Sequence, residues 1–280
     1  MGSHTTARPT DLQGISLNYT LSPPDGVNLW TSIVRPTPPT PWTNVVNDPR
    51  DVIIHDARGR QHEFALDSAG FEFLTYPSAV SDLFDEEFIV KRYYPEIQQM
   101  LLKHTGAQRV VIAGHMHRRS HAGVHKITEF TDVTGPAFSV HGDRTLDAAE
   151  SLAAIGLDHL THGRYRIINV WRPIGNPARD VPLAMLDYRS IDQDRDLVPV
   201  TIEYATQHIE TLAAFYSDKH RWFYLRDQTP QEIILMKNFD SLTDDSLGSQ
   251  FSASFQGHSL LRALDVCMGC TPNRRARPEN

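Results

Sequence analysis

The tripeptide His141-Gly142-Asp143 is the part of this sequence with the clearest capacity for chemistry. It closes a strand predicted over residues 137–141, and alternation along a strand places His141 and Asp143 on one side, with Cα atoms about 6–7 Å apart. An imidazole and a carboxylate so arranged can bind one divalent ion. A second histidine would complete the 2-His-1-carboxylate set of non-haem iron oxygenases. The tripeptide alone is a weak signal, since it often occurs at an ordinary strand end.

The second histidine of such a site must come from far downstream, because facing strands of a barrel are distant in sequence. His258 follows the last strong pair of predicted strands and is our candidate. His208 and His220 are rivals, but His220 is expected at a strand entry because residues 221–224 follow it as a strand. The predicted metal ligands are therefore His141, Asp143 and His258.

A competing metal site is His115-Met116-His117, with His121 and His125 nearby. Two histidines at a strand end can bind zinc. The positive charges of Arg118 and Lys126 lie among these histidines and disfavour a divalent cation there. Zinc at this place is the alternative, although 14 histidines in 280 residues favour metal chemistry in general.

The two cysteines form a single pair, Cys267-Met268-Gly269-Cys270. A structural zinc site normally needs a second such pair, and a thioredoxin-like role needs a βαβ context that this sequence does not predict. We expect two free thiols in a loop, and the last 20 or so residues are predicted to be loop.

Arg172 is a candidate for binding an anionic ligand. It follows Trp171 at the end of a predicted strand, where a guanidinium can bind a carboxylate with two parallel hydrogen bonds while the indole walls the pocket. The competing interpretation is a rim arginine that closes the barrel end. The sequence has no P-loop, no G-x-G-x-x-G and no G-x-S-x-G, which disfavours nucleotide-driven and serine-hydrolase chemistry.

Composition narrows the class further. The 280 residues are 40% hydrophobic and 22% charged, which is typical of a globular protein. The net charge of −7 disfavours a nucleic-acid binder. No apolar run approaches 18 residues, and the first residues lack the pattern of a secretory signal, so we expect a cytoplasmic protein without a membrane span.

The pattern of elements favours an all-β core with flanking helices. Residues 1–45 are predicted as an extended, Pro-rich arm, and residues 46–280 as a single domain. One helix is predicted from about Ser81 to His104, ended by Gly106, and a shorter one over 146–155. Short strands bounded by Gly, Pro and Asp are typical of a barrel or sandwich. They are expected at 52–56, 62–66, 109–113, 137–141, 164–171, 182–188, 197–204, 221–225 and 232–239.

Several segments together resemble one family. In chain order they are Arg58-Gly59-Arg60, residues 63–71, Tyr93-Tyr94-Pro95-Glu96, residues 140–143, residues 168–173, Pro182-Leu183-Ala184, Asp187 with Arg189-Ser190, Asp196-Leu197-Val198, residues 220–224, residues 228–232, Lys237 and Phe239-Asp240-Ser241. The series is similar to the mostly fungal hydroxylase/desaturase family, which includes gibberellin-desaturase-like proteins and the cephalosporin 7α-methoxylase component.

This resemblance implies a double-stranded β-helix (a cupin-like jelly roll) and an Fe(II)/2-oxoglutarate-dependent dioxygenase. The expected reaction is oxidation of an unactivated C–H bond, by hydroxylation, desaturation or cyclisation, in a secondary metabolite or amino-acid-derived precursor. The partners implied are a small-molecule substrate and O2. A zinc-binding or non-catalytic jelly-roll protein acting as a binding partner is the alternative.

Carried over by position, His141 and Asp143 match the family's H-x-D iron ligands. His258 takes the place of the distal histidine, although the family reads Pro-His-Ser/Thr there and this chain reads Gln256-Gly257-His258-Ser259. A different alignment places Ser252 at that position and would leave iron with two protein ligands. The resemblance implies an arginine for the distal carboxylate of 2-oxoglutarate. The candidates for binding the co-substrate are Arg172, Arg274, Arg262 and Asn169.

Overall fold

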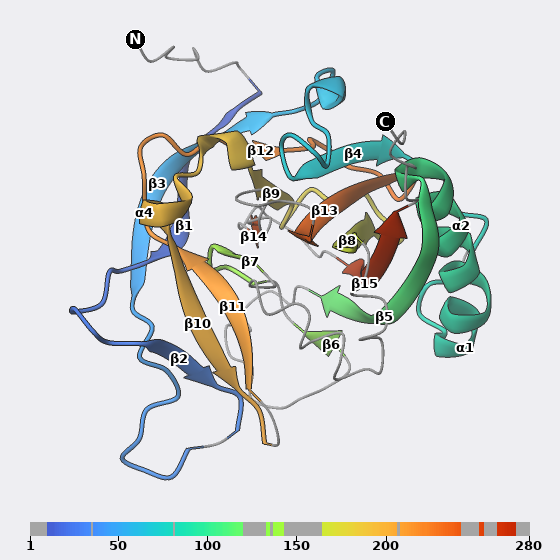
Figure 1. Ribbon diagram of the computed structural model, residues 1–280. Coiled ribbons are helices and arrows are strands. Elements are labelled where there is room, and N and C mark those ends of the chain that lie inside the picture. Colours follow the sequence, from blue (N-terminus) through green and yellow to red (C-terminus); the bar gives the residue numbers. More distant parts are fainter. Residues whose placement is uncertain are drawn as a thin grey trace, which may run out of the picture.

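A computed structural model describes residues 10–34, 36–80, 82–119, 133–134, 137–142, 164–205, 208–241, 252–254 and 262–272. Within these residues two sheets face each other, with helices on the outer side of one of them (Figure 1). The predicted Asp143, His258 and Arg274, together with the short helix expected at 146–155, lie outside the described residues.

The larger sheet has nine described strands in the order β1-β3-β12-β9-β14-β7-β11-β10-β2. Its strands come from all parts of the chain, so several neighbours in the sheet, such as β12 beside β3 and β14 beside β7, are distant in sequence. Their bounds are β1 Leu12–Thr20, β2 Leu29–Ser32, β3 Asn47–Asp56, β7 His141–Gly142, β9 Leu183–Leu186, β10 Leu197–Glu203, β11 His208–Ala214, β12 Trp222–Tyr224 and β14 Ser252–Ser254.

The smaller sheet has six described strands in the order β4-β13-β8-β15-β5-β6. Their bounds are β4 Phe71–Thr75, β5 Ala107–Arg119, β6 Val133–Thr134, β8 Arg166–Pro173, β13 Glu232–Asp240 and β15 Arg262–Pro272. Every residue of β8 and β13 is buried. These two strands are covered on both faces, which explains the apolar run Ile233–Met236 in β13 and the mainly apolar centre of β8.

Two apolar clusters cover the two faces of the smaller sheet. The interior cluster lies between the sheets, since it joins Phe71 and Trp171 of the smaller sheet to Met185 and Phe223 of the larger one. On the other face, Ile168 and Val170 of β8 pack with residues of the helical segment. Trp171 and Phe223 therefore fill the space between the sheets.

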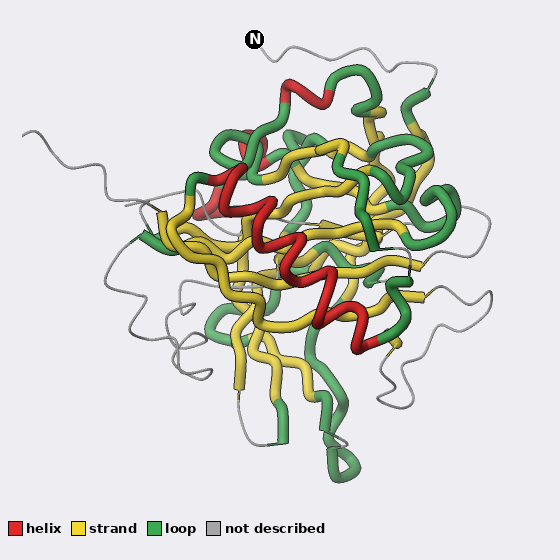
Figure 2. The backbone as a smooth tube through the Cα atoms, turned by 90° about the vertical axis from the view of Figure 1, so that its right-hand side faces the viewer, coloured by secondary structure: helices red, strands yellow, loops and turns green. Residues whose placement is uncertain are grey.

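The predicted helix is present and covers the outer face of the smaller sheet (Figure 2). It consists of α1 (Glu86–Phe88), a π-helical turn (Ile89–Tyr93) and α2 (Tyr94–Thr105). The Asp85 side chain caps the start by accepting from the amide of Phe88 at 3.1 Å. Gly106 ends α2 in the left-handed conformation, with φ of 68°. No helix of the described residues is long and apolar enough to cross a membrane.

Four local expectations differ from the structure. The strand predicted at 137–141 is not formed, because within 137–142 only His141–Gly142 make a strand, so the H-x-D motif opens a strand rather than closing one. Residues 62–66 form no strand, because residues 61–63 make a 3-10 turn that leads into β4. Leu17 and Tyr19, placed in the predicted surface arm, are fully buried in β1, which pairs with β3. The Cys267–Cys270 segment was expected in a loop, but it lies in β15, which pairs with both β8 and β5.

Substituting Gly106 tests the helix end. Gly106→Ala is expected to lower the free energy of unfolding by about 1–2 kcal/mol, because a Cβ disfavours the left-handed conformation. No atom lies within 4 Å of the added Cβ, so the cost is conformational. Urea unfolding would measure it. Gly114→Ala is the matched control, since Gly114 has equal space without a positive φ, and it should be neutral or mildly stabilising. Equal effects of the two substitutions would contradict this account.

Candidate functional site

His141 opens β7, a strand of two residues held between β11 and β14. Its direct neighbours in the register are Ala213 on one side and Ser252 on the other. The Thr211 hydroxyl donates to the carbonyl of Gly142 and fixes the strand end. The H-x-D motif thus begins at a position that is tied to two strands from the distant C-terminal half.

The ring of His141 is oriented by its own backbone. Its Nδ1 lies 2.8 Å from the carbonyl oxygen of Ser139, which can only accept. The Nδ1–H therefore donates, and the neutral ring carries its lone pair on Nε2. A histidine whose second nitrogen donates to a backbone carbonyl is the usual arrangement of a metal ligand. On this observation His141 fits a divalent metal.

The third ligand position has two candidates. Ser252 lies directly opposite His141 in the ladder, and directly opposed residues of neighbouring strands are closest neighbours on one face of a sheet. His258 lies outside the described residues, between the end of β14 and the start of β15. The register places position 252 beside His141 and does not choose between the two candidates, so the ligand set His141, Asp143 and His258 stays a prediction.

The four candidates for co-substrate binding lie in different places. Asn169 is directly opposite Met236, a member of the interior cluster, so it belongs to the interior face of β8. Arg262 opens β15, next to the end of β8. Arg274 lies outside the described residues.

Arg172 is on the opposite side of β8 from the interior. It is 1% exposed, and its guanidinium donates to the Tyr93 hydroxyl at 2.9 Å and to the backbone carbonyls of Tyr76 and Pro230. These partners come from the helical segment and from two loops. The geometry favours a structural role, in which Arg172 joins three segments behind the sheet.

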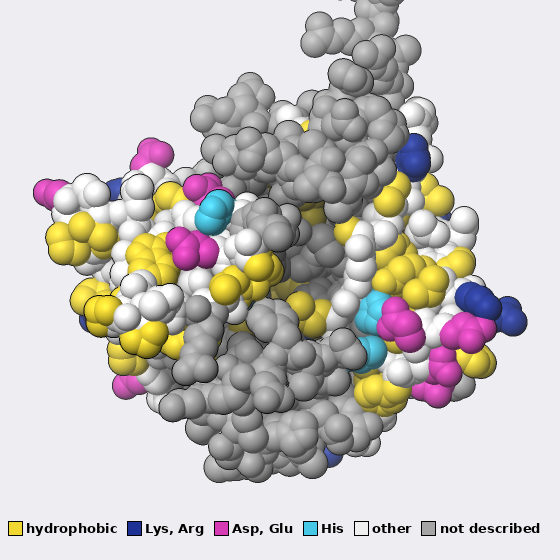
Figure 3. Space-filling view, turned by 90° about the horizontal axis from the view of Figure 1, so that it is seen from below, with side chains coloured by type: hydrophobic (Ala, Val, Ile, Leu, Met, Phe, Trp, Pro, Cys, Tyr) yellow, Lys and Arg dark blue, Asp and Glu magenta, His cyan; other side chains and the backbone are white. Residues whose placement is uncertain are grey.

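Histidine and acidic side chains lie next to each other at two places on the face seen from below (Figure 3). At the competing zinc site, His115 Nε2 lies 3.1 Å from Glu86 and its Nδ1 lies 2.7 Å from the Tyr94 hydroxyl. His117 Nε2 contacts the carbonyl of Leu83 at 2.6 Å. Burial lowers the pKa of His115. These histidines attach the helical segment to β5, and the described residues contain no cluster of three or more side chains arranged for a metal ion.

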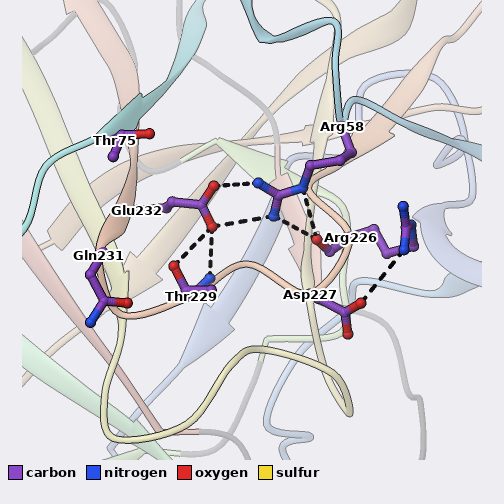
Figure 4. Close-up of a pocket in the computed structure, with 7 residues that line it drawn as sticks. All are labelled: Arg58, Thr75, Arg226, Asp227, Thr229, Gln231 and Glu232. Carbon is purple, nitrogen blue, oxygen red and sulfur yellow. Dashed lines mark hydrogen bonds and ion pairs between the residues drawn. The ribbon is translucent and has the colours of Figure 1, made fainter.

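An open pocket lies where the turn after β3 meets the loop before β13 (Figure 4). Arg58 pairs with Glu232 and also donates to the carbonyl of Arg226. Burial raises the pKa of Glu232, but the hydrogen bonds from Arg58 and Thr229 outweigh it and leave the pKa below its usual range. Arg226 is in turn paired with Asp56 at 2.9 Å. The charged side chains of this pocket are therefore engaged in ion pairs with one another or with Asp56. These ion pairs join the loops that line the pocket.

The chain has the fold of a known oxygenase. A structure of the iron and alpha-ketoglutarate-dependent endoperoxidase NvfI superimposes with a TM-score of 0.79 over 94% of this chain and 99% of that one, at 24% identity. The fold is therefore the double-stranded β-helix of that oxygenase, as the sequence predicted.

Sequence relatives define the family. The model described as "Oxidoreductase/YMDC permease-like domain" matches residues 17–261. The hydroxylase/desaturase CTB9 of Cercospora beticola is 30% identical over 82% of this chain and 76% of its own length. The Fe(II)/2-oxoglutarate-dependent dioxygenase nvfI of Aspergillus novofumigatus is 31% identical over 74% of this chain and 76% of its own. The chain belongs to the fungal hydroxylase/desaturase family.

Substituting Arg172 tests its structural role. Arg172→Lys is expected to lower the free energy of unfolding by about 2–3 kcal/mol, because an ammonium cannot reach all three buried partners at once. Chemical denaturation would measure the loss. Arg179→Lys is the control, since Arg179 is 67% exposed beside Asp227 and should change stability by less than about 0.5 kcal/mol. A stable Arg172→Lys protein would contradict the assignment.

Proposed function

We propose that this chain is an Fe(II)- and 2-oxoglutarate-dependent dioxygenase that oxidises an unactivated C–H bond of a small secondary metabolite or amino-acid-derived precursor. The relatives named as such dioxygenases and the shared double-stranded β-helix support this function. The single observation that carries it to this chain is His141, oriented as a metal ligand on β7. The expected products of the reaction are those of hydroxylation, desaturation or oxidative cyclisation. The cytoplasmic location stays a prediction.

The protein's own contribution is to hold and shield the reactants. Bound iron with 2-oxoglutarate supplies an oxidising power towards C–H bonds that amino-acid side chains lack. His141 offers Nε2 and Asp143 a carboxylate, and we propose His258 for the third ligand, with Ser252 as the competing position. Asn169 on the interior face offers polar contacts to the co-substrate. Arg262 and Arg274 are the proposed partners of its distal carboxylate, since Arg172 is engaged behind the sheet.

The interior cluster supports a water-poor reaction space. Phe64, Phe71 and Phe73 pack with one another, and Phe64 also packs against Phe223, at ring-centroid distances of 4.6–5.7 Å. Closely packed rings of this kind exclude water and hold their positions. We propose that a substrate bound between the sheets packs against these rings.

Metal titration decides the ligand set. Anaerobic equilibrium dialysis of Fe(II), with the visible absorption band of the 2-oxoglutarate complex as a second readout, is the measurement. His141→Ala should weaken metal binding by about 100-fold or more, since losing even an outer partner of a ligand costs about 10–100-fold. His258→Ala should do the same if His258 is the third ligand.

Ser252→His separates the two candidates for the third position. Where Ser252 holds that position, Ser252→His strengthens Fe(II) binding and His258→Ala leaves it unchanged. Ser254→His is the matched control, because position 254 lies opposite Leu183 rather than His141. Wild-type protein that takes up no Fe(II), together with an ineffective Ser252→His, would contradict the proposed function and favour the non-catalytic alternative.

A further inference from the structure

A buried series of hydrogen-bonded side chains lies on the face of the larger sheet that points away from the interior cluster. Trp222 and Tyr19 are fully buried, and Trp222 Nε1 lies 2.7 Å from the Tyr19 hydroxyl. The same hydroxyl lies 3.1 Å from Nδ1 of His220, whose Nε2 lies 3.1 Å from the Asp196 carboxylate. Four oxidisable or titratable groups are therefore linked in series, outside the proposed metal site.

The direction of each hydrogen bond in this series is determined. The indole N–H can only donate, so the Tyr19 oxygen accepts from Trp222. Burial lowers the pKa of His220, although Asp196 acts in the opposite direction, and this lowering favours the neutral ring. Because the Asp196 carboxylate accepts, His220 donates from Nε2 and accepts at Nδ1. The Tyr19 hydroxyl thus donates to a base, and burial keeps it protonated by raising its pKa.

Short backbone contacts connect this series to the candidate metal ligand. Asn18, the neighbour of Tyr19, forms a bridge with Ser139, and its carbonyl accepts from the amide of Val140 at 2.8 Å. Ser139 is the residue whose carbonyl orients the ring of His141. Val140 packs in one cluster with Tyr19 and Trp222. Given strand spacings of about 4.8 Å and a rise of about 3.3 Å per residue, the backbone path from Tyr19 through Asn18 and Val140 to His141 is roughly 11 Å long.

On its other side the series approaches the surface. Tyr216 packs edge-on against Tyr19, with ring centroids 5.3 Å apart, and is 38% exposed. The Arg50 guanidinium lies over the Tyr216 ring, 5.0 Å from its centroid. An aromatic contact therefore runs from the buried tyrosine to a ring that solvent reaches.

We propose that Tyr19 is a protective one-electron donor that reduces the metal centre when O2 activation occurs without a substrate to oxidise. The proposal rests on the proposed function, which supplies the oxidant. Tyr19 loses one electron to the oxidised centre, and its phenolic O–H bond breaks as the proton passes to Nδ1 of His220. The products are a neutral tyrosyl radical and an imidazolium paired with Asp196. A soluble one-electron reductant such as ascorbate restores Tyr19 through the exposed Tyr216.

Tyr224 provides a comparison within the same cluster. It is also buried, but its hydroxyl donates to the backbone carbonyl of Thr10 at 3.0 Å, which cannot accept a proton outright. The Tyr224 hydroxyl therefore does not donate to a histidine, whereas the Tyr19 hydroxyl donates to Nδ1 of His220, which can take its proton together with the electron. Tyr224→Phe is for that reason the matched control for Tyr19→Phe.

The first experiment uses the full chain loaded with Fe(II) and 2-oxoglutarate and mixed with O2 in the absence of substrate. Freeze-quenched samples are measured by electron paramagnetic resonance, and succinate is measured in the same samples. Wild type and Tyr224→Phe should give a tyrosyl signal that narrows when the protein contains ring-deuterated tyrosine. Tyr19→Phe should give none, and His220→Gln should give a strongly reduced signal because the amide is no base. Tyr19→Phe should also inactivate itself after severalfold fewer succinate-forming turnovers.

The outcomes separate the two proposals. Succinate formation without a Tyr19-dependent radical, and with equal self-inactivation of Tyr19→Phe and Tyr224→Phe, overturns the protective role. Absence of succinate contradicts the proposed function instead. The electron donor is then tested in metal-free protein by photo-oxidation with ruthenium tris-bipyridine and persulfate. A radical of equal size in wild type and Tyr19→Phe overturns the proposal there. Where thermal melting shows that Tyr19→Phe is unfolded, His220→Gln carries the comparison.

Discussion

The short ladder around β7 is the constraint on which the candidate site depends. A strand of two residues has little stability of its own, and β7 is fixed by β11, by β14 and by the bridge from Ser139 to Asn18. A metal ligand needs a position defined to a fraction of an ångström. The position of the His141 ring is fixed in this way, because the backbone that places the residue also orients the ring.

The two faces of the larger sheet have different chemistry because of the alternation along its strands. Phe223 points into the apolar interior. Its neighbours Trp222 and Tyr224 point to the opposite face of the sheet, where they pack in one cluster with Tyr19. An oxidisable Trp–Tyr pair is therefore separated from the reaction space by one layer of backbone. This arrangement keeps phenol and indole groups away from a substrate while leaving them close to the H-x-D strand.

Much of the architecture could be predicted from the sequence, and the reason is local. The helix up to Gly106 and the strands β8, β12 and β13 have strong periodicity or apolar runs, and the family resemblance supplied their arrangement. Residues 62–66 look equally strand-like, but the turn at Gln61–Glu63 takes precedence there. β15 was missed because its charged and proline-rich surroundings read as loop, although the strand pairs on both sides.

The site was predicted less completely, because it depends on register. The sequence shows that His141 and Asp143 share a strand end, but no local pattern shows that Ser252 lies opposite His141. The direction of the Arg172 side chain was hidden for a similar reason. β8 is buried on both faces, and the sequence of such a strand does not reveal which face its polar residues occupy.

The strand order also dictates how this chain must assemble. Tyr19 and His220 are 201 residues apart, and Arg58 and Glu232 are 174 apart, yet each pair is in contact. Contacts of such sequence separation form slowly, because the loop entropy is lost before the contact compensates for it. During synthesis β1 can pair with β3 early, but β8 has its partner β13 only when residues 232–240 have been made. Until then both edges of the buried strand β8 lack a partner, because β15 is made later still, and such open edges favour aggregation of the newly made chain.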